Sequence, residues 1–334
     1  MGGFMPDNSE LSPAHEGGGL ENVIMPERAT TYTRYLFVIG FCVYFGMVWY
    51  LGWREIGSLL LSASGGPIAL AAALLLVGTW ARAWKWRYAL GPGERAVGIF
   101  FLSKGAANWS PARIGEFSPM ILRRHRTAKV GAWIMLDRLI EIVVTLVLGL
   151  VGLAVIRIVP LGLYCVILAG AVLACVANFY LLTRRAFFLR VAEKRDPASW
   201  THRLAMLMAA VSEELHIFKS RLPIILIVTV ITKITDLWAV VLIFGALGFL
   251  VEFYLVAAAK CALAMVSFFP FTPTSTAIPH GVQAWMMNTA ADIPYEGLVA
   301  GIGVEVVLVS VTFWTSFAIG ASSLRKPGAA VDSP

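Results

Sequence analysis

The chain has 334 residues, of which 58% are hydrophobic and only 14% charged, and its mean hydropathy is +0.76. Soluble domains carry about a quarter charged residues, so this composition excludes a soluble globular protein and predicts an all-α polytopic membrane protein. The 27 Lys and Arg residues exceed the 20 Asp and Glu residues, and the formal charge is +7. In a membrane protein such an excess reports loop orientation, so we expect no nucleic-acid partner.

The chain begins with a polar stretch, residues 1–33, that is rich in Gly, Pro and acidic residues. Such a segment cannot bury enough apolar surface to fold, which predicts a disordered cytosolic tail. It also lacks the basic and apolar regions of a cleaved signal peptide. A short polar tail, residues 325–334, is expected at the other end.

Between the tails, residues 34–324 form the predicted transmembrane domain. Windows of about 20 apolar residues can cross the bilayer, and six occur, at 35–53, 67–86, 131–156, 161–182, 222–248 and 297–320. Two shorter apolar segments, 96–109 and 256–269, each run into a Pro-rich break, which favours re-entrant helical hairpins. The mixed basic and apolar stretch 183–222 is interpreted as a cytosolic amphipathic linker between two halves.

The two halves show signs of a repeat. Pro67 and Pro223 open equivalent spans, Lys104 and Lys260 lie in the two short segments, and both pairs are 156 residues apart. Three crossings and one hairpin per half would invert the second copy relative to the first, as in many transporters. Coincidental similarity between apolar segments is the alternative interpretation.

The distribution of basic residues sets the expected orientation. With a cytosolic N-terminus, 20 of the 27 basic residues fall on the cytosolic side, two outside and five at membrane depth, which follows the positive-inside rule. The cytosolic group includes Arg82, Lys85 and Arg87, which alternate with Trp80, Trp84 and Trp86. This segment is interpreted as an interfacial belt, with a ligand site as the alternative. We therefore expect a multi-pass membrane protein with a cytosolic N-terminus.

Ionisable residues at membrane depth are the candidate functional groups, because each costs about 2.5 to 3.5 kcal/mol at the centre of a membrane helix. They can form an internal salt-bridge network, and some of the cations can face a polar cavity and hold an anionic substrate group. Both interpretations can hold at once. Arg138 can reach Glu141 one helical turn away, whereas Asp137 needs a partner from another element. The predicted substrate-binding residues are Lys104, Asn108, Arg113, Glu116, Asp137, Arg138, Glu141, Lys233, Asp236, Lys260, Thr272, Thr274 and Glu305.

Other chemistry finds little support in the sequence. The four cysteines lie in apolar segments without metal-ligand spacing, and no nucleotide-binding loop, HExxH or GxSxG motif occurs. We expect no metal, no cofactor and no enzymatic activity.

The first hairpin contains Gly105, Asn108, Pro111, Arg113, Gly115 and Glu116, and the third span contains Asp137, Arg138 and Glu141. Together these residues resemble a known family, the flippase-like transmembrane domain of the lysylphosphatidylglycerol synthase superfamily, which implies a multi-pass protein of the bacterial inner membrane. The resemblance implies lipid handling by a stand-alone bacterial member without the aminoacyl-transferase domain. In the second hairpin, Thr274, Ser275 and Thr276 replace the glycines usual in the family, which implies a different substrate contact.

These observations predict a translocase that moves an anionic lipid across the membrane, with membrane lipids as its partners and oligomerisation left open. The first alternative is a membrane-embedded transferase acting on a lipid-linked sugar or head group, with Asp137 or Glu116 as the general base. The second alternative is a scaffold for a partner enzyme.

Overall fold

A computed structural model describes residues 42, 46, 49, 50, 52–91, 96–108, 116, 127–157, 162, 166, 169, 170, 173, 176, 177, 180, 183–196, 199–267 and 277–320. All regular secondary structure in these ranges is helical, which confirms the predicted all-α class. The tails 1–33 and 325–334 and most of the predicted spans 35–53 and 161–182 lie outside the described residues.

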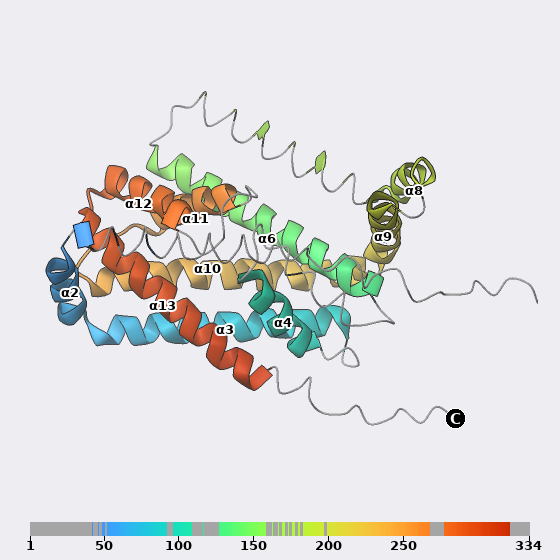
Figure 1. The fold of residues 1–334 in the computed structure, drawn as a ribbon. Coiled ribbons are helices and arrows are strands. Elements are labelled where there is room, and N and C mark those ends of the chain that lie inside the picture. The colour runs from blue at the N-terminus through green and yellow to red at the C-terminus, as the bar shows by residue number, and fades with distance from the viewer. Residues whose placement is uncertain are drawn as a thin grey trace, which may run out of the picture.

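The long helices lie side by side in a bundle, and α8 and α9 stand at one end of it (Figure 1). In chain order they are α2 (Trp53–Ser62), α3 (Gly65–Leu90), α4 (Ala96–Asn108), α6 (Thr127–Ile156), α8 (Arg185–Glu193), α9 (Trp200–Glu214), the 3-10 helix η4 (Leu215–Arg221), α10 (Leu222–Ala246), α11 (Phe253–Ser267), α12 (Ala277–Ala291) and α13 (Tyr295–Gly320).

Four helical segments are long and apolar enough to cross a membrane: Gly65–Leu90, Lys129–Ile156, Ile217–Ala246 and Tyr295–Ile319. They correspond to four of the six predicted spans and confirm a multi-pass membrane protein. The helices α4 and α11 contain the shorter apolar segments Ala96–Gly105 and Phe253–Ala264, at the two places where hairpins are predicted. The Pro-rich turns of these hairpins lie outside the described ranges, so re-entry stays a prediction.

The helices α3 and α10 lie side by side as a long antiparallel pair (Figure 1). At one end the Ser64 N–H donates to the Ala246 carbonyl over 2.9 Å, and at the other Arg221 donates to the Ala89 carbonyl over 2.5 Å. Fully buried alanines, including Ala71, let the two backbones approach closely, as small residues do in membrane helix pairs. This pairing brings residues about 150 positions apart in the sequence together.

Close contact also joins α11 to α6 and α4 to α13. A side chain at Gly149 of α6 would collide with Cys261 of α11. A side chain at Gly105 of α4 would lie 3.5 Å from the Phe317 ring of α13. Each short helix therefore packs against a long helix from the other half of the chain, and this arrangement encloses the centre of the bundle.

The predicted linker 183–222 contains α8, α9 and η4, at the end of the bundle opposite α2 (Figure 1). The Ser199 hydroxyl caps α9 by accepting from the Thr201 N–H over 3.3 Å. One exposed ion pair, Arg185 to Glu213 at 3.4 Å, ties α8 to α9. The cytosolic position of this linker stays a prediction.

Candidate functional site: a charged cavity between the long helices

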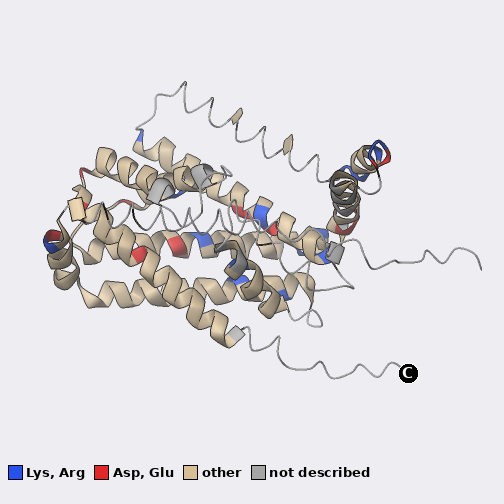
Figure 2. Ribbon diagram, viewed as in Figure 1, with Lys and Arg blue, Asp and Glu red and all other residues tan. Residues whose placement is uncertain are grey.

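Charged residues gather on the long helices between the two ends of the bundle (Figure 2). Nine of the predicted site residues are described there: Lys104, Glu116, Asp137, Arg138, Glu141, Lys233, Asp236, Lys260 and Glu305. Arg113, Thr272 and Thr274 lie outside the described residues, and Asn108 is described only as the last residue of α4. The structure therefore shows how close nine of the ionisable residues lie to one another. The positions of Arg113, Thr272 and Thr274 relative to them stay a prediction.

A cavity of about 570 Å³ lies between α3, α4, α6, α10, α11 and α13. Its wall contains eight of the predicted residues and one further cation, Arg82. Asp137 does not line the cavity but belongs to the ion-pair network beside it. The rest of the wall is largely aliphatic and aromatic, with residues such as Leu146, Val240 and Phe313. These eight residues therefore share one cavity wall, although they come from distant parts of the chain.

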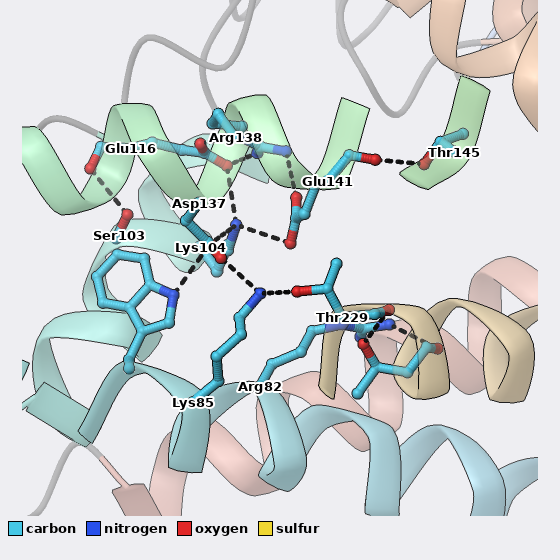
Figure 3. A network of polar contacts seen from close by, with 12 residues as sticks. Arg82, Lys85, Ser103, Lys104, Glu116, Asp137, Arg138, Glu141, Thr145 and Thr229 are labelled. Atoms are coloured by element: carbon cyan, nitrogen blue, oxygen red, sulfur yellow. Dashed lines mark hydrogen bonds and ion pairs between the residues drawn. The ribbon is translucent and has the colours of Figure 1, made fainter. Parts of the chain in front are cut away.

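Lys104 is the centre of the first charged cluster (Figure 3). Its ammonium nitrogen lies 3.6 Å from a carboxylate oxygen of each of three acids, Glu116, Asp137 and Glu141. All four residues are buried, with at most 8% of their surface exposed. Three carboxylates around one ammonium repel one another, so additional cations are needed to stabilise the cluster.

Arg138 supplies one of these cations. Its guanidinium forms an ion pair with Glu116, and its Nη1 lies 2.8 Å from Glu141, which confirms the predicted contact along α6. Glu116 itself is fixed to α4, because the Ser103 hydroxyl donates to its backbone carbonyl over 2.8 Å. The first hairpin and the third span, which carry the family motif, are therefore joined by the ion pair between Glu116 and Arg138.

Lys85 of α3 supplies the other cation, which the sequence interpretation missed. It lies 2.5 Å from Asp137 and donates to the Thr229 hydroxyl of α10 over 3.0 Å. The Trp86 Nε1–H donates to the second oxygen of Asp137 over 3.0 Å. Asp137 therefore has the partner from another element that its position demanded.

Lys85 and Trp86 are each only 1% exposed, so assigning them to an interfacial belt was wrong. Trp84 is 50% exposed and stacks on Tyr88, as a residue of such a belt would. A polar stripe contained the missing signal, because Thr79, Arg82 and Lys85 follow one another at three-residue spacing on one face of α3. The alternation of Trp with basic residues suggested a membrane interface instead, so this polar face was not recognised from the sequence.

Arg82 forms a second cluster with α10. Its guanidinium makes an ion pair with Asp236 and donates to the Thr232 carbonyl over 3.4 Å. Their side chains are 19% and 30% exposed, more than those of the first cluster. Arg82 therefore crosslinks two spans beside the cavity, a role that the sequence interpretation did not assign to it.

A third cluster joins α11, α12 and α13. Lys260 pairs with Glu305, and the amide of Gln283 bridges them by accepting from Lys260 over 3.2 Å and donating to Glu305 over 3.4 Å. Gln283 is fully buried, and it was not among the predicted residues because a single amide in an apolar segment gives no spacing signal. The internal salt-bridge network considered from the sequence is therefore present.

Comparison with known families gives the same assignment as the motif. Residues 37–320 match the family model described as the lysylphosphatidylglycerol synthase TM region. The chain belongs to this family. No curated protein and no solved structure gave a match. The family assignment confirms the resemblance, whereas stand-alone status and bacterial origin stay predictions.

In this member of the lysylphosphatidylglycerol synthase TM family, the polar groups of the site are mainly charged side chains. In the described ranges, no group of three or more His, Cys, Asp or Glu side chains is arranged to hold a metal ion. Instead, the cavity wall presents ammonium, guanidinium and carboxylate groups beside aliphatic surface. Such a wall can hold a charged head group and an apolar chain at the same time.

Proposed function

We propose that the protein is a translocase that moves an anionic lipid across the membrane in which it resides. The observation that carries this proposal is the charged cavity among the candidate membrane spans. Ionisable residues at this depth are costly and mark substrate pathways in membrane proteins. Family membership supports a role at the membrane, and the substrate and its movement are our proposal.

The two-sided composition of the cavity wall supports a lipid over a small soluble anion. Cations such as Lys104 and Lys260 line it together with apolar residues from α6, α10 and α11. A phospholipid has the same division, because its head group is charged and its acyl chains are apolar. The head group would contact the ion-pair clusters while the chains follow the apolar wall.

We further propose that the two halves form an inverted repeat. Lys104 of α4 pairs with Glu141 of α6, and Lys260 of α11 pairs with Glu305 of α13. The helices α3 and α10, which hold corresponding places in the two halves, run antiparallel. Equivalent charged pairs on opposed halves are the arrangement expected for alternating access to a central site.

Transport is favoured over the transferase alternative by the state of the candidate bases. Asp137 is bound by Lys85 and Trp86, and Glu116 is bound by Arg138. A general base must be able to reach and accept a substrate proton, and carboxylates held by cations are poorly suited to that role. We therefore propose lipid movement without a covalent step.

Purified protein reconstituted in vesicles tests the proposal. Vesicles carry acyl-labelled fluorescent phosphatidylglycerol, phosphatidylserine or phosphatidic acid, and dithionite bleaching reports how fast label leaves the inner leaflet. We expect faster movement of at least one of these lipids than in protein-free vesicles. Equal rates with and without protein for all three would overturn the proposal.

A paired substitution links this transport to the cavity. Lys260→Gln/Glu305→Gln removes both charges of the third cluster without leaving one unpaired, and we expect transport to fall about tenfold. The matched control, Arg185→Gln/Glu213→Gln, removes an ion pair with both side chains 55% exposed and should leave the rate unchanged. A similar rate in both double variants would place lipid movement outside the cavity.

A further inference from the structure

Lys233 differs from the other cations of the cavity wall. It lies on α10, three residues before Asp236, and lines the cavity. Within the part of the chain that the structure describes, it makes no ion pair and no hydrogen bond. An ammonium group in a membrane cavity needs either water or an anion to stabilise its charge.

The carboxylates nearest in electrostatic terms cannot fully satisfy Lys233. Its charge interacts mainly with Glu141 and Asp236, at separations too long for an ion pair. Glu141 is already bound by Arg138, and Asp236 is already bound by Arg82. Lys233 therefore faces the cavity as the cation whose electrostatic demand is least met.

The formal charges of the described wall give the same result. The wall contains five cations and four carboxylates, so one positive charge remains in excess. They are Arg82, Lys104, Arg138, Lys233 and Lys260 against Glu116, Glu141, Asp236 and Glu305. A ligand with one negative charge would complete the balance.

Hydroxyl groups of the wall add a second preference. Thr79, Thr145 and Thr312 each donate their proton to a backbone carbonyl one turn earlier, over 2.8, 2.7 and 2.8 Å. Their oxygen lone pairs remain available, so they accept hydrogen bonds better than they donate them. They suit a head group that carries hydroxyl donors.

We propose that Lys233 binds the phosphate of a singly charged phosphodiester lipid whose head group carries hydroxyls and no ammonium group. This inference rests on the proposed function and names its substrate class. A zwitterionic lipid would leave the charge of Lys233 uncompensated, because its ammonium cancels its phosphate. A phosphomonoester, with more than one negative charge, would exceed the single positive charge available.

The transport assay separates these head groups. Phosphatidylglycerol, phosphatidylethanolamine and phosphatidic acid, each labelled on an acyl chain, are compared in vesicles of phosphatidylcholine. We expect phosphatidylglycerol to move fastest in the wild type, and Lys233→Gln to slow it at least about tenfold, as the loss of a charge-assisted hydrogen bond implies. Lys233→Arg, which keeps the charge, should recover most of the rate.

Lys219→Gln is the matched control, because this lysine is exposed on η4, outside the cavity. Its transport rate should equal that of the wild type. An unchanged rate in Lys233→Gln, or faster movement of either other lipid in the wild type, would overturn the inference while leaving the proposed translocase intact. Absence of transport of every lipid by the wild type would instead overturn the proposed function.

A binding measurement in detergent distinguishes a lipid from a free phosphodiester. Short-chain phosphatidylglycerol and glycerophosphoglycerol, which has no acyl chains, are titrated against the protein while its melting temperature is followed. We expect the short-chain lipid to raise the melting temperature of the wild type and of Lys219→Gln, but not that of Lys233→Gln. Equal stabilisation by glycerophosphoglycerol, or stabilisation of Lys233→Gln by the lipid, would overturn the inference.

Discussion

At the scale of single residues, the charged side chains of the site differ in how closely they are paired with an opposite charge. Lys85 and Asp137 are both 1% exposed and bind each other, so the pair has no access to solvent. Taking two charges out of water is costly, and the attraction between them offsets that cost only while both are present. Lys233, by contrast, is only partly buried and lines the cavity. Buried pairs therefore stabilise the site, and the less neutralised cation is available to a ligand.

Removing one member of the buried pair should be strongly destabilising. Asp137→Asn leaves Lys85 without its counter-ion, and we expect the free energy of unfolding to fall by about 3 to 5 kcal/mol. The double variant Lys85→Met/Asp137→Leu should lose less, because it leaves no unpaired charge. Thermal melting in detergent measures both changes.

The control for this prediction is Glu213→Gln, which breaks the exposed pair with Arg185 and should cost about 0 to 1 kcal/mol. A melting temperature of Asp137→Asn equal to that of the control would contradict the buried pairing.

At the scale of helices, close packing decides which charges can meet. Gly149 lets α6 approach α11 so closely that a side chain there would collide with Cys261. The same approach brings Glu141 of α6 and Lys260 of α11 to one cavity wall. Small residues on the long helices thus determine the width of the cavity as well as the stability of the bundle.

Enlarging this glycine should separate the two helices. Gly149→Val places a branched side chain against Cys261, and we expect a loss of about 1 to 3 kcal/mol in the free energy of unfolding from overpacking. Gly245→Ala on α10 is the control, because a side chain there meets nothing within 4 Å. Thermal melting compares them, and an equal melting temperature for the two variants would argue against the close contact.

At the scale of the whole molecule, the antiparallel pair α3 and α10 defines two ends of the bundle. Ser58 lies on α2 at one end, and Ser220 lies on η4 at the other. Both are exposed. The excess of basic residues near α8 and α9 predicts that the second end faces the cytosol.

Cysteine labelling in intact cells tests this orientation. In a variant without its native cysteines, a membrane-impermeant maleimide should modify Ser58→Cys at once and Ser220→Cys only after the membrane is permeabilised. The reverse order would invert the proposed topology, and labelling of both in intact cells would mean that the two ends are not on opposite sides of the membrane.

Local spacing was enough to predict part of the site. Arg138 and Glu141 are one helical turn apart, so their contact follows from the geometry of α6. The same reasoning indicated that Asp137 needs a partner from elsewhere, but the identity of that partner could not be predicted. Lys85 is 52 positions earlier, and its alternation with tryptophans had the pattern of a membrane interface.

The sequence by itself determined the membrane class, four of the spans, the family motif and the set of ionisable residues that the membrane makes costly. These follow from hydropathy and spacing along the chain, which are local properties. Only the tertiary structure decided the ion-pair partners, such as Arg82 with Asp236, 154 residues apart. It also placed Lys233 in the cavity beyond ion-pair distance of the acids described there. Which charges neutralise one another depends on how helices distant in sequence pack, and that packing leaves no periodic signal in the chain.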